Sequence, residues 1–242
     1  MSKFKRFELN TTGRDFAVGD VHGHFTKLQA ALDAAGFNPV VDRLFSVGDL
    51  VDRGPESEQV LTWLEKPWFH AVEGNHEDMA IGYAKRALRD DLYMHNGGVW
   101  LMAKDRDEQH QFAAALADLP VAIEVATADG LVGIVHADCP YQSWPEFKRA
   151  LVDGGPTELA SVIASCQWSR SRIASENHEG VSGVRAVIVG HTPVRQPAIL
   201  GNVYHIDTGA WMGGHFTLID LATLQCYPPI NPKLTWDWED RS

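Results

Sequence analysis

Six short apolar runs in this chain each end in polar residues of the types that bind metal ions or phosphate. The runs are rich in β-branched and aromatic residues and are bounded by turn residues, which is typical of β-strands. They span residues 16–18, 44–47, 69–72, 131–135, 186–189 and 203–206. Ligand-type residues just past several strands predict a site in the loops at the carboxyl ends of a sheet.

Apolar residues recur at helical spacing in four other stretches, which are 26–35, 57–64, 77–88 and 108–119. Pro55 precedes the second stretch and Pro120 follows the fourth, as expected at the ends of helices. Strands that alternate with helices predict the α/β class.

The C-terminal part has a different character. Residues 215–220 and 223–227 predict a hairpin, and residues 228–242 form an irregular tail that is rich in Pro, Trp and acidic residues. Trp236 and Trp238 in this tail are interpreted as packing residues, with a docking patch as the alternative. Because the chain has no internal repeat and no long linker, we predict a single domain over residues 1–242 with its core at about 15–221.

The composition argues against several classes of protein. A net charge of −11 without a block of Lys and Arg disfavours nucleic acid and membranes as partners. No apolar run approaches about 18 residues, so we expect no transmembrane helix, and the N-terminus does not read as a secretory signal. The cysteines Cys139, Cys166 and Cys226 form no C-x-x-C pair, which favours a reducing cytoplasm over a disulfide framework.

The strand-end segments contain six candidate metal ligands. They are Asp20, His22, Asp49, Asn75, His136 and His191. Each residue taken alone also has a structural interpretation. It could be part of a turn, a helix cap at Asn75, or a structural histidine at the end of a strand whose ring is hydrogen-bonded within the protein. Together, six such ligands with one bridging carboxylate are what a pair of divalent ions requires once water and phosphate fill the open positions.

Three further residues beside these ligands have the chemistry of phosphate cleavage. Asp52 and Arg53 follow Asp49 within one glycine-flanked segment, and an Arg guanidinium is suited to holding a phosphate dianion. His76 is adjacent to Asn75, so the two side chains diverge and His76 can point at a substrate. An exposed turn with an internal ion pair is the alternative for the segment around Arg53.

These segments resemble the fingerprints of the phosphoprotein phosphatase family of metallophosphoesterases, especially its small phage and bacterial members. The matching motifs are GDVHG (19–23), GDLVDRG (48–54), GNHE (74–77), VHAD (135–138) and GHT (190–192). Segments 96–98, 168–170 and 206–210 are also similar, so the likeness covers nearly the whole chain. It implies the calcineurin-like metallophosphoesterase fold, an α/β architecture with a central β-sandwich of two mixed sheets flanked by helices.

The resemblance also implies a role for each residue. The ligands of one ion would be Asp20, His22 and Asp49, and those of the second would be Asp49, Asn75, His136 and His191. Arg53 and Arg170 would hold the phosphoryl oxygens, while His76, paired with Asp52, would protonate the leaving alkoxide. The resemblance favours manganese, although iron or zinc suits the same ligands, and a hydroxide bridging the two ions would attack phosphorus directly.

The expected function is a metal-dependent phosphomonoester hydrolase, namely a serine/threonine protein phosphatase that acts on phosphoproteins or phosphopeptides. A symmetrical dinucleoside tetraphosphate hydrolase is the nearest alternative, but its fingerprints tend to read GDLVARG and GNHD. A non-catalytic phosphate-binding protein is the second alternative. It is disfavoured because every ligand, both arginines and the acid–base pair are present.

Overall fold

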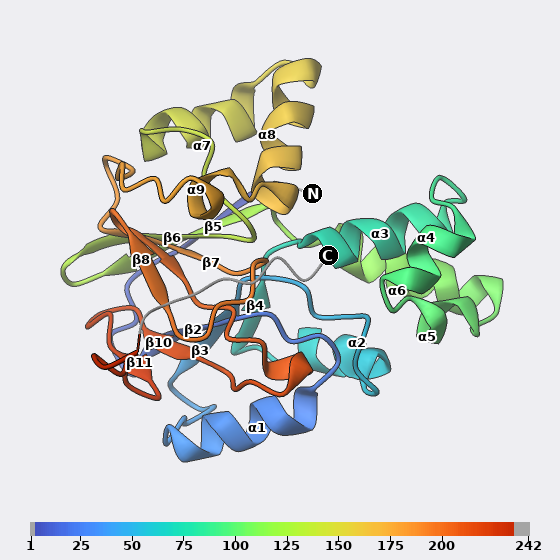
Figure 1. The fold of residues 1–242 in the computed structure, drawn as a ribbon, viewed down its shortest axis with the longest axis horizontal. Coiled ribbons are helices and arrows are strands. Elements are labelled where there is room, and N and C mark those ends of the chain that lie inside the picture. Colours follow the sequence, from blue (N-terminus) through green and yellow to red (C-terminus); the bar gives the residue numbers. More distant parts are fainter. Residues whose placement is uncertain (1–2, 235–242) are drawn as a thin grey trace.

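The computed structural model describes residues 3–234 and contains two β-sheets packed against each other (Figure 1). The first sheet contains, in spatial order, β1 (Phe4–Phe7), β5 (Ala122–Thr127), β6 (Gly130–Val135), β7 (Ala186–Val189), β9 (Val203–His205) and β8 (Ala198–Leu200). The second contains β11 (Cys226–Tyr227), β10 (Leu218–Asp220), β2 (Asp15–Val18), β3 (Arg43–Ser46) and β4 (Phe69–Ala71). Both sheets combine parallel and antiparallel pairs, which confirms the predicted sandwich of mixed sheets.

The central strands are buried on both faces, which explains their continuous apolar sequences. Ala17 and Phe45 of the second sheet pack with Ile134 and Ile188 of the first, so these side chains form the layer between the sheets. Phe16 and Leu44 point the other way, into a cluster shared with the helices.

Helices cover the outer faces of both sheets (Figure 1). The second sheet is covered by α1 (Phe25–Ala34), the 3₁₀ turn η1 (Ser57–Gln59) and α2 (Val60–Leu64), and the first by α7 (Trp144–Asp153), α8 (Pro156–Trp168) and α9 (Ser171–Ala174). A separate group beside the sandwich contains α3 (Asn75–Ala84), α4 (Asp90–His95), α5 (Val99–Met102) and α6 (Arg106–Ala117). None of the helices within residues 3–234 combines the length and apolar character needed to cross a bilayer.

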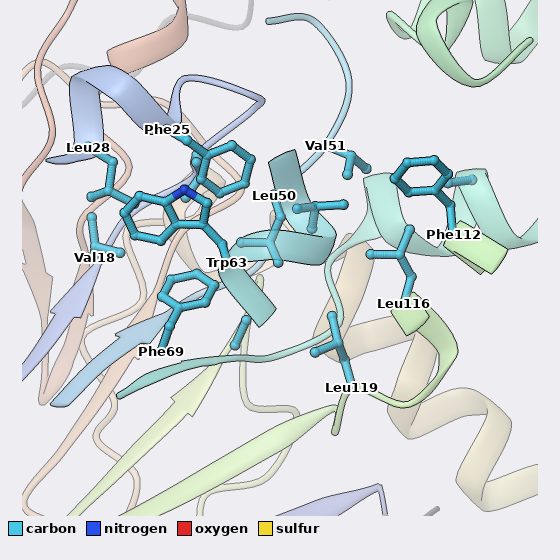
Figure 2. Close-up of a cluster of buried hydrophobic side chains, with 14 of the residues drawn as sticks. Val18, Phe25, Leu28, Leu50, Val51, Trp63, Phe69, Phe112, Leu116 and Leu119 are labelled. Atoms are coloured by element: carbon cyan, nitrogen blue, oxygen red, sulfur yellow. The ribbon is translucent and has the colours of Figure 1, made fainter. Parts of the chain in front are cut away.

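One apolar cluster joins this helical group to the sandwich (Figure 2). Phe25 stacks on Trp63, with ring centroids 5.2 Å apart, on one side of the cluster, and Phe112 lies on the other. Leu50 and Val51 lie between these groups and are completely buried. Because Leu50 and Val51 directly follow Asp49, the core anchors the loop that carries the predicted bridging ligand.

The structure corrects several predicted boundaries. The helix expected from Glu77 begins at Asn75, because the Glu77 carboxylate accepts the N–H of Gly74 at 2.8 Å and closes the first turn two residues earlier. It ends at Ala84 rather than residue 88, and the helix at 57–64 starts as a 3₁₀ turn. Trp236 and Trp238 lie outside the described residues.

The loops that follow the strands meet at one edge of the sandwich. Val21 and His22 donate backbone hydrogen bonds to the carbonyl of Asp49 at 3.0 and 2.7 Å, which joins the loops after β2 and β3. Gly190 donates to the carbonyl of His136 at 2.7 Å, which joins the loops after β6 and β7. The motif segments are therefore neighbours in space, as their position after strands predicted.

A glycine in β6 makes room for a buried tryptophan of α7. A Cβ atom on Gly133 would lie 2.3 Å from the Trp144 ring, whose Nε1 donates to Glu124 at 2.7 Å. We expect Gly133→Ala to lower the free energy of unfolding by about 1–3 kcal/mol, the usual cost of overpacking, as measured by urea denaturation. Gly155→Ala is the control, because no atom lies within 4 Å of its Cβ position. Equal losses in the two variants would contradict this account.

Candidate metal centre

Several of the predicted site residues have a backbone conformation that ordinary residues avoid. The residues with a positive φ are His22 at 45°, Asp49 at 51°, Asp52 at 68°, Arg53 at 67° and His191 at 67°. Each such residue costs about 1–3 kcal/mol, so the surroundings must impose these angles. Such strain is concentrated at functional sites.

Glu77 is the main restraint on the loop after β3. Its buried carboxylate accepts the backbone N–H groups of Asp49 at 2.8 Å and Leu50 at 2.7 Å, in addition to that of Gly74. Burial of the Leu50 and Val51 side chains adds roughly 1.5–3 kcal/mol each, which is comparable to the strain. The loop is therefore restrained by hydrogen bonds to its backbone and by burial of its side chains.

Asp49 lies at the middle of the site, and its two carboxylate oxygens face different histidines. Oδ1 is 3.3 Å from His136 Nε2, and Oδ2 is 3.5 Å from His22 Nε2. The backbone N–H of His76 donates to Oδ1 at 3.0 Å, which fixes the carboxylate. This geometry lets one carboxylate serve two adjacent cation positions.

The tautomers of His22 and His136 turn a lone pair towards these oxygens. His136 Nδ1 donates to the Val47 carbonyl at 2.7 Å, and His22 Nδ1 donates to the Val51 carbonyl at 3.0 Å. Burial is the main reason why the pKa of each ring lies below its usual value, so both are neutral and each Nε2 is an acceptor. For His136 this leaves an acceptor that faces a carboxylate oxygen, which is unfavourable unless a cation lies between them, whereas His22 Nε2 is also reached by the Arg53 guanidinium at 3.0 Å.

The remaining predicted ligands extend the site on either side of Asp49. Asn75 Oδ1 is 2.8 Å from both His136 Nε2 and His191 Nδ1. Asp20 Oδ2 lies 3.9 Å from His22 Nε2, and both of its oxygens accept the backbone N–H of His191, at 3.1 and 3.2 Å. The structure thus brings all six predicted ligands together.

These donors fit a pair of divalent ions. Two sets have ligand atoms that all lie within 4.8 Å of one another, and they are His22, Asp49 and His76, and Asp49, His136 and His191. Asp49 belongs to both sets. His191 Nε2 is also buried without a hydrogen-bond partner among the described residues. Neutral imidazoles with carboxylates suit Mn, Fe or Zn.

His76 and Asp52 form a buried pair beside the metal ligands. His76 Nδ1 lies 2.8 Å from Asp52 Oδ2, which leaves Nε2 to face the site. The other oxygen of Asp52 accepts hydrogen bonds from Tyr93 Oη at 2.9 Å and Trp100 Nε1 at 2.7 Å. Because these donors come from α4 and α5, the helical group fixes the carboxylate that orients His76.

The two predicted phosphate-binding arginines are exposed and differ in their contacts. Arg53 Nη1 is 3.0 Å from His22 Nε2, and its guanidinium lies 4.1 Å from the centroid of the Trp211 ring, so it is already held at the site. Arg170 begins α9, and its side chain has no hydrogen bond or ion pair within residues 3–234. It is still near the metal ligands, because its charge adds to burial in lowering the pKa of His136 and His191.

Sequence reasoning missed several residues of this site, namely Glu77, Tyr93, Trp100, Asp207 and Trp211. Two of them carried a usable signal, because Asp207 directly follows an apolar run as the predicted ligands do and Glu77 is the last residue of the GNHE motif. The others act through contacts between segments distant in the sequence, as Tyr93 does with Asp52.

Comparisons with known proteins agree with this geometry. The family model described as calcineurin-like phosphoesterase matches residues 16–195. Serine/threonine-protein phosphatase 1 of Salmonella typhimurium is 36% identical over 218 residues, which cover 89% of this chain and 95% of that protein. A symmetrical bis(5'-nucleosyl)-tetraphosphatase of Erwinia tasmaniensis is 29% identical over 164 residues, which cover 61% of this chain and 60% of that protein. A protein serine/threonine phosphatase structure from Saccharomyces cerevisiae has a TM-score of 0.59 at 17% identity, covering 98% of this chain and 83% of that chain, so it shows the fold alone.

The buried acids predict how metal affinity depends on pH. Burial and neighbouring charge raise the pKa of Asp20 well above its usual value, and burial is the main cause that raises that of Asp207 to about 6. Below about pH 6 Asp207 holds a proton, and the raised pKa of Asp20 means that a cation must displace a proton there too, so the affinity for Mn²⁺ should rise with pH by about tenfold per pH unit for each proton released. His191 adds no proton to this release, because burial lowers its pKa to about 2.

Isothermal titration calorimetry from pH 5 to pH 7.5, in buffers of different ionisation enthalpy, measures both the affinity and the protons released. Affinity that does not change over this range would contradict the assignment.

Proposed function

The chain belongs to the calcineurin-like phosphoesterase family, and from this premise we propose that it is a serine/threonine-protein phosphatase with two divalent metal ions. The observation that carries the proposal is the placement of Asp49, whose two oxygens face His22 and His136 beside the His76–Asp52 pair. This arrangement contains the parts that hydrolysis of a phosphomonoester needs, namely cation ligands and a proton donor.

We assign the residues around Asp49 to two cation positions. One would be held by Asp20, His22 and Asp49, and the other by Asp49, Asn75, His136 and His191. Manganese is the proposed metal, although iron and zinc suit the same donors. When bound, such ions lower the pKa of water and neutralise charge on phosphoryl oxygens.

Arg53 and Arg170 are the proposed phosphate-binding residues. Arg53 is held above the Trp211 ring, 3.0 Å from His22, so its guanidinium is positioned before substrate arrives. The Arg170 guanidinium is exposed and has no partner among the described residues, so it is free to pair with a phosphoryl oxygen. Two planar cations beside the metal ligands favour a dianion and stabilise the charge of the transition state.

His76 is the proposed general acid for the leaving alkoxide. The contact with Asp52 fixes the ring through Nδ1–H and stabilises the imidazolium form, whose Nε2–H would be the proton that faces the site. The cysteines are poor candidates for a nucleophile, because Cys139, Cys166 and Cys226 are all buried and burial raises the pKa of each thiol. These free thiols fit a reducing cytoplasm, where we place the protein.

Phosphoproteins or phosphopeptides are the proposed substrates. The Salmonella protein phosphatase matches over nearly its whole length, whereas the Erwinia tetraphosphatase matches over 60% of its length. The sequence GDLVDRG–GNHE also favours the protein phosphatases.

Removal of the general acid should affect substrates according to their leaving groups. We expect His76→Asn to lower kcat by about 10²–10⁴ on a phosphoserine peptide and much less on p-nitrophenyl phosphate, whose leaving group needs no proton. His70→Asn is the control, because His70 lies in β4 among aromatic residues and belongs to neither ligand set. Equal losses on the two substrates would remove His76 from this role.

The substrate class is tested by a direct comparison. The manganese-loaded protein should have a higher kcat/KM on a phosphothreonine peptide than on diadenosine tetraphosphate, since its motifs are those of protein phosphatases and the Salmonella protein phosphatase matches nearly the whole chain. The opposite order would assign it to the tetraphosphatases. Absence of hydrolysis of either substrate, with metal binding intact, would assign it to non-catalytic phosphate-binding proteins.

A further inference from the structure

One buried carboxylate at the edge of the metal centre has an oxygen that no donor group in the described part of the chain satisfies. Asp207 follows β9 and is 1% exposed. Its Oδ1 accepts the backbone N–H of Gly209 at 2.9 Å, which is an ordinary turn contact. Its Oδ2 is buried and faces no hydrogen-bond donor among the described residues, and its carboxylate is close enough to that of Asp20 to share a proton with it. A free carboxylate oxygen in the interior is costly unless a cation or a donor faces it.

The backbone places Asp207 between two of the proposed ligand loops. Ile206 donates to the Val189 carbonyl at 2.8 Å, and Val194 donates to the Asp207 carbonyl at 2.9 Å, so the segment runs beside the loop of His191. On the other side, a Cβ atom on Gly19 would lie 3.1 Å from Asp207 Cα. The absence of a side chain at Gly19 therefore lets Asp20 and Asp207 approach each other.

The charges around Asp207 are unbalanced within the protein itself. Asp20, Asp49 and Asp207 lie within electrostatic reach of one another, and the cation that acts on Asp207 is Arg53. After burial, the charge of Asp207 raises the pKa of Asp20 more than the charge of Asp49 does. When Asp20 and Asp207 are ionised, three buried carboxylates lie beside one guanidinium, and the excess of negative charge is one that divalent cations would neutralise.

We infer that Asp207 is a positioning residue of the metal centre, which adds negative charge to the cation position formed by Asp20 and His22. Its carboxylate lies next to that of Asp20, so it acts on that position through Asp20. Carboxylates in such places commonly set metal affinity by about 10–100-fold. The inference rests on the proposed two-ion centre and assigns to it an acid beyond the six ligands.

The variant Asp207→Asn tests this role, because its amide oxygen can still accept the N–H of Gly209 while the charge is lost. In the presence of a chelator, we expect its Tm to equal or exceed that of the unchanged protein, since one of two facing carboxylates is removed. Saturating Mn²⁺ should raise its Tm by less than it raises that of the unchanged protein. Calorimetry should show an affinity about 10–100-fold lower for one ion and little change for the other.

Asp220→Asn is the matched control, because Asp220 is a buried acid whose Oδ1 only accepts the N–H groups of Ala222 and Thr223. Any change in the Tm of this variant should be equal with and without Mn²⁺, and the variant should keep the affinity for both ions. Asp207→Ser, which keeps an oxygen that can accept the N–H of Gly209, should behave like Asp207→Asn.

One result would contradict this role. Both Asp207 variants would have a lower Tm than the unchanged protein in the presence of chelator, and Mn²⁺ would raise their Tm by as much as it raises that of the unchanged protein. Asp207 would then be only a cap of its turn, and unfolding of both variants would lead to the same conclusion. Measurements on the unchanged protein show whether this role of Asp207 or the proposed function has failed. If it binds two Mn²⁺ ions and hydrolyses a phosphopeptide, only the role of Asp207 is lost; if it binds none, both proposals are lost.

Discussion

The site depends on one buried carboxylate held in an unfavourable backbone conformation. Asp49 has a φ of 51° and presents one oxygen to His22 and the other to His136. The Glu77 carboxylate, which accepts backbone N–H groups from the Asp49 loop, maintains this conformation from the first turn of α3. If Asp49 relaxed to an ordinary conformation, its carboxylate would turn away from one of the histidines. The two cation positions would then lose their shared ligand.

The helical group beside the sandwich has a specific chemical role. Tyr93 in α4 and Trp100 in α5 both donate to the Asp52 oxygen that does not face His76. Asp52 is completely buried, so these donors satisfy a carboxylate that would otherwise be costly in the interior. The ring of His76 is consequently oriented by groups from three helices, because α3 carries His76 itself. The two sheets supply most of the proposed metal ligands, while the helical group positions the proposed acid.

The sequence predicted the strands that carry the site better than it predicted the remainder of the fold. Strands such as β2 and β6 are buried on both faces, and their apolar runs ended where expected. The strands β1, β5 and β8 and the helices α4, α5, α7, α8 and α9 were not predicted. β1 has only four residues, of which Lys5 and Arg6 are charged and exposed, and it pairs with β5, which lies more than a hundred residues away. Such a strand is defined by its partner rather than by its own sequence pattern.

The site likewise has features that local sequence patterns predict and features that depend on contacts between distant segments. The sequence by itself determined the chemical types and the strand-end positions of the residues that meet at Asp49, because ligand chemistry and strand periodicity are local properties. Only the tertiary structure decided that Glu77 restrains the Asp49 loop, that Tyr93 and Trp100 hold Asp52, and that Asp207 lies behind Asp20. These contacts join residues that are distant in the sequence. They are selected by the packing of whole elements, which no local pattern in the chain encodes.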